Sequence, residues 1–318
     1  MKKLFISMLA VAALASCSQE DVIVADKGDL IGFNSFVENS TRADKATDPS
    51  YKAATLDHFN VYGAVGGVNI YAGNRVTRGD EADLGDAWSM AADAPTQYWI
   101  ADAQYNFAAV VDVDEDSNNL PDGVTVDENG MPETIVYNTE NQNDLLYAEA
   151  TATGKASGND KVNFTFAHLL SKAQFTVKSN TADGYFHNVT NIKVKNFETG
   201  TYTVGAATPW STASAPTDAW ISFGDITGVE ATDTDGVTNT TQKLLLPTTT
   251  DFVVTFTVEI WNGTTKLGTQ DYTKTVSQDL AAGNTYNFNL NLSVGELIQF
   301  TVTTNPTWAN GSDTTLTL

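Results

Sequence analysis

The chain has 318 residues, 42% of them hydrophobic and 18% charged, which suits about two globular domains rather than a disordered polymer. Its 39 Asp and Glu outnumber its 17 Lys and Arg, for a formal net charge of −22, so the surface repels phosphate backbones and nucleic acid is not an expected partner. Cys17 is the only cysteine, which excludes an intramolecular disulfide and leaves packing alone to stabilise an exported fold.

The first residues have the parts of an export signal. Lys2 and Lys3 precede an apolar run over residues 4–14, which is too short to span a bilayer. The run ends in Leu14-Ala15-Ser16-Cys17, which resembles the bacterial lipoprotein signal, where the chain is cut before an acylated Cys. We predict a signal peptide over residues 1–16 and lipidation of Cys17, which anchors the chain to a membrane. An ordinary secretory cleavage site that happens to contain Cys is the alternative.

An acidic tether and a candidate strand follow Cys17. The tether, Ser18-Gln19-Glu20-Asp21, resembles the signals that direct lipoproteins of the Bacteroidetes to the outer face of the outer membrane. Residues 30–37 are predicted to form the first strand, with Leu30, Phe33 and Phe36 facing the core. Because this spacing departs from strict alternation, the strand would need a bulge or a one-sided fit.

The rest of the chain alternates apolar and polar residues and shows no sustained helical period. The clearest hairpin surrounds Asn262-Gly263, because Asn-Gly adopts the positive φ angles of a tight turn. The expected strands are residues 56–65, 68–76, 97–100, 105–111, 135–137, 145–148, 162–166, 174–178, 189–197, 243–246, 252–261, 264–276, 285–292 and 297–302. Residues 199–218 are expected to be mainly loop. The sequence therefore predicts an all-β fold with two tandem β-sandwich domains.

The Gly- and Ser-rich segment 154–160 is the expected domain boundary. It divides the chain into an N-terminal sandwich over residues 43–155 and a C-terminal sandwich over residues 156–318.

Five motif groups run in order along the two predicted sandwiches. They are FNVYG at 59–63, QYW at 97–99 with YNFAA at 105–109, DLLYA at 144–148, FTFAHLLSK at 164–172 and LAAGNTYNF at 280–288. With the lipoprotein signal, this set resembles the fimbrillin family of the Bacteroidetes, which comprises pilins and pilin-like adhesins. The resemblance implies transthyretin-like sandwiches and a structural role in a cell-surface fimbria, or pilus, that serves adhesion.

The resemblance also implies a mode of assembly. Many members of the family are cut after an Arg just beyond the first strand, and a strand of the next subunit then fills the vacated groove by β-augmentation. Thr41-Arg42-Ala43 matches this pattern, which implies cleavage between Arg42 and Ala43 and a propeptide over residues 17–42. The implied partners are other fimbrial subunits, an Arg-specific surface protease and the outer membrane, through the lipid anchor.

Several alternatives stay open on the sequence alone. Residues 30–37 form either a removable strand or a permanent one. Residues 314–318 are either a detachable appendage or part of a segment, residues 297–318, that closes the second sandwich. An unpolymerised surface lipoprotein that binds a glycan or a host protein is the alternative to a fimbrial subunit, and the stalk, anchor or tip position is undecided.

One acidic stretch resembles a calcium loop. Its alternating candidate ligands are Asp112, Asp114, Asp116 and Asn118. Counted from Asp114, the places that an EF-hand fills with Gly and a bidentate Glu hold Asn119 and Thr125, so we interpret the stretch as an acidic hairpin tip.

No other motif indicates catalysis or a cofactor. The three histidines lie far apart in sequence, and no Gly-x-Ser-x-Gly, Walker or His-Glu-x-x-His motif occurs, so the chain is predicted not to be an enzyme. Trp99 and Trp261 lie in strand patterns and are expected in the core, whereas Trp210 and Trp220 flank a polar loop and are candidates for ligand contacts.

Overall fold

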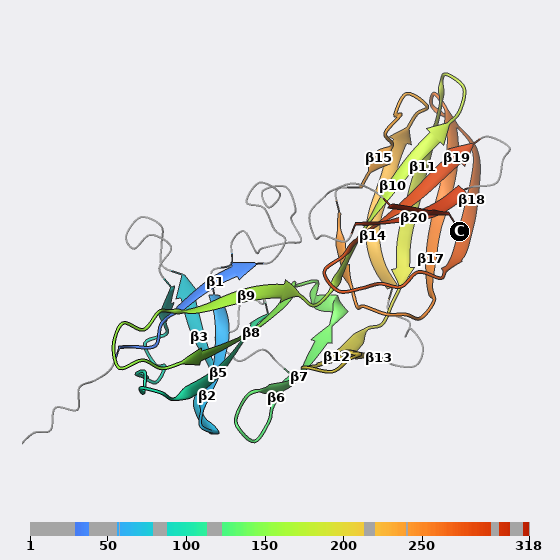
Figure 1. Cartoon of the computed structure of the whole chain (residues 1–318). Coiled ribbons are helices and arrows are strands. Elements are labelled where there is room, and N and C mark those ends of the chain that lie inside the picture. Colours follow the sequence, from blue (N-terminus) through green and yellow to red (C-terminus); the bar gives the residue numbers. More distant parts are fainter. Residues whose placement is uncertain are drawn as a thin grey trace, which may run out of the picture.

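The computed structural model describes residues 29–37, 56, 58–78, 88–112, 123–212, 220–239, 241–293, 299–305 and 314–317. These residues are nearly all β-strand, joined by turns and one 3-10 helix, η3 (Thr139–Asn141). None of the described residues belongs to a helix with the length and apolar character that a membrane crossing requires. Figure 1 shows the strands gathered in two bodies that lie end to end. The predicted all-β fold with two sandwiches is confirmed.

The first sandwich is built on a seven-stranded sheet. Its order is β1 (Phe33–Val37), β9 (Val162–His168), β8 (Leu145–Thr153), β5 (Gln104–Asp112), β2 (His58–Val65), β3 (Val68–Arg78) and β4 (Trp88–Met90). The facing sheet has the order β13 (Trp210–Thr212), β12 (Thr199–Thr203), β7 (Pro132–Asn138) and β6 (Val124–Val126). Both sheets contribute side chains to one apolar core, including Phe59, Phe107, Phe164 and Tyr137.

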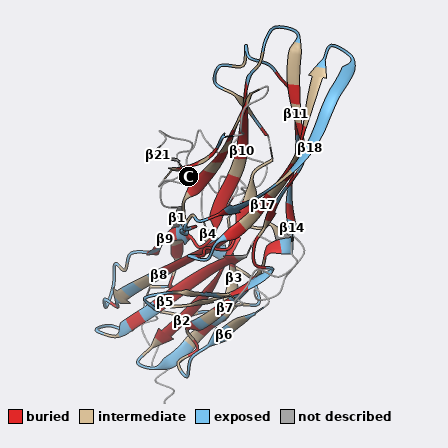
Figure 2. Ribbon diagram, turned by 90° about the vertical axis from the view of Figure 1, so that its right-hand side faces the viewer, coloured by how far each residue is buried: buried red, intermediate tan, exposed pale blue. Residues whose placement is uncertain are grey.

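The second sandwich has its own core. One sheet follows the order β15 (Val237–Thr238), β10 (Ser171–Asn180), β19 (Thr285–Ser293), β20 (Gln299–Asn305) and β21 (Thr314–Thr317), with β16 (Lys243–Leu245) also paired to β10. The other sheet has the order β14 (Trp220–Val229), β11 (Tyr185–Lys195), β17 (Phe252–Asn262) and β18 (Thr265–Val276). Phe175, Phe223 and Phe288 lie fully buried between them. Figure 2 shows buried residues along the facing strands, and β18 exposed along most of its length.

Alternating residues decide which side chains enter the cores. In β9, Val162, Phe164 and Phe166 are buried, while the polar residues between them are exposed, as the period of two predicts. The hairpin of β17 and β18 turns at Gly263 with a φ of 54°. One expected strand is wrong: in residues 97–100 the pairing is reduced to a single bridge between Tyr98 and Leu30.

The chain does not pass from one sandwich to the other at a single point. The Gly- and Ser-rich segment 154–160 connects β8 to β9, two paired strands of the first sheet, so a boundary between residues 155 and 156 falls inside the first sandwich. The core changes instead between Leu170 and Ala173. Residues 199–212 then return to the first sandwich, where β12 pairs with β7. This segment was expected to be mainly loop, and its strands form because they continue the sheet of β7.

Candidate functional site

The first described segment, residues 29–37, lies between two other parts of the first sandwich. Residues 33–37 form β1, which pairs in parallel with β9. On the opposite side, the backbone N–H of Ile31 donates to Gln97 O over 3.1 Å, and that of Trp99 donates to Asp29 O over 2.9 Å. We call the place that residues 29–37 occupy between residues 97–99 and β9 the strand slot.

Two side chains of this segment enter the first core. Ile31 is 5% exposed and Phe33 is 1% exposed, whereas Leu30 is 61% exposed. The prediction that Leu30 faces the core is therefore wrong, because strict alternation from Ile31 to Phe33 turns Leu30 outward and no bulge is needed there. The side chain of Phe36 lies outside the described residues.

The ring of Phe33 is surrounded by aromatic side chains from four strands. It stacks on Phe164 with centroids 5.8 Å apart, and it meets Phe59, Tyr71 and Phe107 edge to face at 6.5, 5.7 and 5.7 Å. Such ring pairs stabilise by about 0.5–1.5 kcal/mol each beyond the burial of their area. The Phe33 position is thus a site that fits an aromatic ring.

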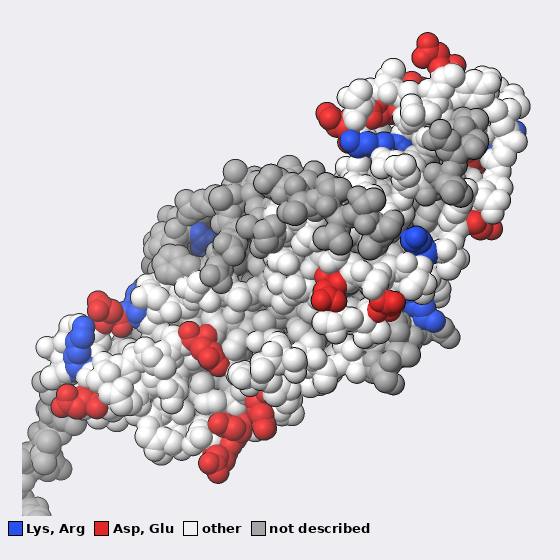
Figure 3. All heavy atoms as spheres, turned by 45° about the vertical axis from the view of Figure 1, so that its right-hand side comes forward, with Lys and Arg blue, Asp and Glu red and all other residues white. Residues whose placement is uncertain are grey.

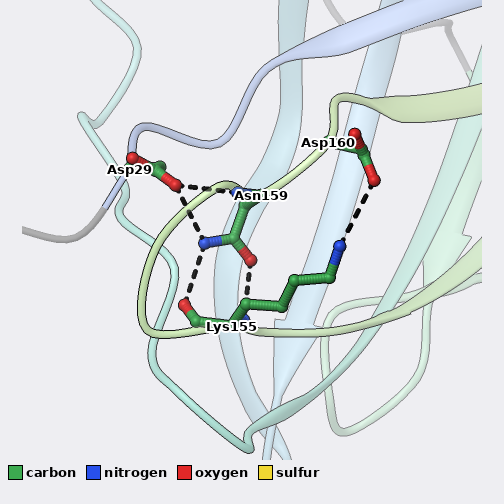
Figure 4. A network of polar contacts seen from close by, with 4 residues as sticks. All are labelled: Asp29, Lys155, Asn159 and Asp160. Atoms are coloured by element: carbon green, nitrogen blue, oxygen red, sulfur yellow. Dashed lines mark hydrogen bonds and ion pairs between the residues drawn. The ribbon is translucent and has the colours of Figure 1, made fainter.

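A polar clasp holds the leading end of the segment. Asp29 Oδ2 accepts hydrogen bonds from the backbone N and the side-chain Nδ2 of Asn159, at 2.8 and 3.2 Å (Figure 4). Asn159 is itself fixed by Lys155, whose backbone N and O it contacts at 2.7 and 2.9 Å. The bonds from Asn159, the backbone one first, hold the pKa of Asp29 below its ordinary value of 3.8.

A pocket of about 400 Å³ lies on the side of the segment that faces β4. Its apolar lining includes Ile31, Phe33, Tyr71, Trp88 and Met90. β1 ends the strand order of its sheet, so the seam between β1 and β4 is not closed by backbone pairing among the described strands. The first strand therefore has a partner strand on one side and an apolar pocket on the other.

Several residues singled out from the sequence lie outside the described residues. They are Cys17, Arg42, Ala43, Asp114, Asp116 and Asn118. The backbone of Asp112 ends β5. Within the described ranges, no three His, Cys, Asp or Glu side chains are grouped as a metal site requires.

The tryptophans differ from one another in their surroundings. Trp210 is half-buried, and its Nε1 donates to Leu169 O over 2.9 Å, so it packs on the first core rather than offering a free face. Trp220 is 42% exposed, with Lys195 Nζ lying 5.9 Å from the ring centroid. Trp99 is buried as expected, but Trp261 is half-buried on the outer face of its sheet, where it stacks on Phe186.

The face of the molecule in Figure 3 shows no broad field of one charge on its described atoms. Acidic and basic side chains are scattered there among uncharged ones.

Sequence reasoning missed Asn159 and Ile31 in the strand slot. Ile31 was detectable, because it stands two residues before Phe33 and continues the alternation. Asn159 gave no local signal, because its partner Asp29 lies 130 residues away.

Comparison with known proteins identifies relatives of the chain. The family model described as fimbrillin-like matches residues 26–308. A fimbrial protein of Bacteroides vulgatus shares the fold with a TM-score of 0.59 at 15% identity, over 87% of this chain and 98% of that one. A proposed cell adhesion protein of Bacteroides uniformis has a TM-score of 0.52 at 20% identity, over 87% and 97%. A search of curated protein sequences returned no match.

Proposed function

The chain belongs to the fimbrillin-like family, and on this premise we propose that it is a fimbrial subunit joined to its neighbours by strand exchange in the first sandwich. Membership of the family supports the coarser statement, a fimbrial role in adhesion at the cell surface. The strand slot supports the finer one.

The observation that carries the proposal is the position of residues 29–37. They form a terminal strand with only five paired residues in β1, yet they insert Ile31 and Phe33 into the core. Burying each of these side chains stabilises by about 1.5–3 kcal/mol. A strand from another subunit that supplies two apolar side chains at the same spacing offers the same gain, so the slot suits replacement of one strand by another.

The N-terminal residues up to Arg42 provide the membrane anchor and the cleavage site that the proposal requires. Lipidation of Cys17 holds the subunit at the outer membrane, and cleavage between Arg42 and Ala43 by an Arg-specific surface protease separates the first strand from the sandwich. Residues 17–42 then act as a propeptide that keeps the strand slot filled until the subunit reaches the surface.

Substitution of Arg42 tests the cleavage step. We expect Arg42→Ala and Arg42→Lys to leave the chain folded and to abolish SDS-resistant ladders of the surface protein, since neither variant offers the protease an Arg. Lys45→Ala, three residues away, serves as the matched control and should polymerise normally. N-terminal sequencing of shed material should give Ala43 as the first residue. Ladders of unchanged intensity from both Arg42 variants would overturn the proposed cut.

An unpolymerised surface adhesin is the second candidate. The 42% exposure of Trp220 favours a ligand contact on the outer face of the second sandwich. If lipidated chain starting at Cys17 is the sole surface form, and Trp220→Ala lowers adhesion to a glycan or host protein, this candidate replaces the first.

A further inference from the structure

Exposed aliphatic side chains gather at one end of the first sandwich. They are Leu30, Val68, Ile100 and Val126, with 61%, 63%, 59% and 47% of their surface exposed. We call these four side chains the end patch. Among the described residues only three other large apolar side chains are exposed, and they are dispersed on β7, β14 and β18. We propose that the end patch rests on a lipid bilayer, so that the uncut subunit lies against the membrane that anchors it. This inference rests on the lipid anchor of the proposed function.

Strand pairing brings the four residues to the same end. Leu30 precedes β1 and Ile100 precedes β5. Val68 begins β3, just after the turn at Gly66 and Gly67. Because β1 is parallel to β9, and β9, β8, β5 and β2 are antiparallel in turn, the starts of β1, β9 and β5 share one end with the β2–β3 turn. Figure 1 shows the start of β9 at the end of the first body that lies away from the second.

Two members of the patch lie on the segments that pair at the strand slot. Leu30 forms a bridge with Tyr98, and Ile100 follows Tyr98 by two residues. Trp99 between them is only 5% exposed and turns inward, so Tyr98 and Ile100 turn outward on the side of Leu30. The backbone N of Ile100 donates to Tyr105 Oη over 2.8 Å, which holds Ile100 at the start of β5.

The other two members lie on turns that pack against each other. Asn69, next to Val68, donates from Nδ2 to Gly130 O over 3.5 Å. Gly130 belongs to the turn that follows Val126, it has a φ of 78°, and an added Cβ there would overlap the side chain of Asn69. Only glycine suits such a position, so the contact between the two turns is specified by the sequence. The end of β2 pairs with the start of β5, which joins this pair of turns to Ile100.

The position of the patch relative to Cys17 favours a bilayer as its partner. Asp29, where the described chain begins, follows Cys17 by 12 residues, a length that spans at most about 40 Å when fully extended. A lipid on Cys17 therefore keeps Leu30 and its neighbours close to the membrane surface. Because a tether raises the effective concentration of the two surfaces, a patch too small to bind a bilayer by itself is held in contact with one. Aliphatic side chains gain by entering the boundary between headgroups and acyl chains.

The charges beside the patch favour uncharged headgroups. The exposed acidic residues of the described turns at this end are Asp102, Asp127, Glu128 and Asp160, and the exposed basic ones are Lys155 and Lys161. This excess of carboxylates repels an anionic surface, so a zwitterionic bilayer is the better partner.

The proposed cut would also end this contact. Leu30 precedes Arg42 in the chain, so cleavage separates both the tether and one member of the patch from the first sandwich. The membrane contact therefore belongs to the uncut subunit and weakens when the subunit is released.

Quenching of a fluorescent label by lipids tests the contact. A chain that carries a hexahistidine tag in place of residues 1–17 is bound to phosphatidylcholine vesicles that contain a nickel-chelating lipid, so the tether does not depend on natural lipidation. Cys17 is the only cysteine, so Ile100→Cys provides a single thiol for the label. Lipids with a nitroxide near the headgroup should quench this label at least about threefold more than the same label at Leu267→Cys. Leu267 is the matched control, because it is 55% exposed but lies on β18 of the second sandwich.

Substitutions show whether the patch acts as a unit. Leu30→Asn with Val68→Asn should lower quenching of the label at position 100 at least about threefold, because the patch loses two of its aliphatic side chains. Val136→Asn with Leu267→Asn is the matched pair outside the patch and should leave quenching unchanged. All four residues are exposed, so circular dichroism should show both variants folded. Replacement of part of the phosphatidylcholine by phosphatidylserine should reduce quenching.

The outcomes separate this inference from the proposed function. Equal quenching of the labels at positions 100 and 267 would overturn the membrane contact. A change in emission at position 100 that needs no vesicles and grows with protein concentration would overturn it as well, and would assign the patch to contacts between proteins. Neither result bears on strand exchange, which the Arg42 variants test. A mature chain without lipid on Cys17, detected by mass spectrometry, would remove the anchor from the proposed function whatever the vesicles show.

Discussion

Among the described strands, each sandwich contains one parallel pair, and the two pairs differ in how many residues they join. In the second sandwich β10 and β19 share nine residue pairs, and β19 is paired on its other side with β20. In the first, β1 and β9 share five, and β1 ends the strand order. The same local geometry is thus an interior part of one sheet and a peripheral part of the other. The first strand is terminal in its sheet, although its ring is almost as deeply buried as that of Phe288.

Truncation of Phe288 should have the largest effect on stability. Phe288→Ala removes a fully buried ring that contacts Phe175, Phe252 and Phe300, so we expect the free energy of unfolding of the second sandwich to fall by about 4 kcal/mol. Chemical denaturation followed by circular dichroism measures this loss. A fall no larger than the loss that Phe33→Ala causes in the first strand would mean that β19 is no more firmly held than β1.

The equivalent change in the first strand should act locally. Phe33→Ala weakens the docking of residues 29–37 by about 3 kcal/mol, but the remaining core residues stay buried because β1 is terminal. Amide hydrogen exchange should therefore speed up in residues 29–37 and stay slow in β2 and β5. Leu30→Ala, at an exposed position, is the matched control. Equal acceleration throughout the first sandwich would show that β1 unfolds only with the whole domain.

Loss of the hydrogen bonds between Asp29 and Asn159 should have the smallest effect on how firmly residues 29–37 are held. This effect should depend on pH. The pKa of Asp29 is lower in the slot than in the released strand, so the clasp contributes fully above the ordinary pKa of 3.8 and is lost as pH falls through the lower, folded value. Release of the cut strand should therefore accelerate at acid pH. Asp160 and Lys155 lie beside the clasp, so Asp29→Asn is needed to isolate it. An undiminished acid response in that variant would exclude Asp29 as its source.

The sequence predicted those parts of the fold that depend on local alternation. Val162, Phe164 and Phe166 identified β9 and its buried face, and Asn262-Gly263 identified the hairpin. The same reasoning failed for Leu30, because Leu30, Phe33 and Phe36 stand three residues apart, whereas Ile31 and Phe33 alternate. It also expected a strand at residues 97–100, where the structure has a single bridge to the first segment.

The strand slot itself could not be predicted from the local alternation of apolar and polar residues. Its walls are residues 97–99 and β9, and no local pattern specifies a parallel pairing across some 130 residues. The predicted domain boundary between residues 155 and 156 was misplaced for a related reason. The Gly- and Ser-rich segment 154–160 has the composition of a linker, but it connects two strands of one sheet.

Three consecutive leucines near β16 have a mechanical consequence. Leu244 and Leu246 belong to the first core, and Leu245 belongs to the second. Gln142 of the first sandwich also bonds the backbone N and O of Leu244, at 3.0 and 3.1 Å. The two cores therefore cannot separate without drawing a leucine out of one of them. A tensile load on the chain passes from one body to the next through buried side chains, and bending at the junction is resisted by packing rather than left to a flexible joint.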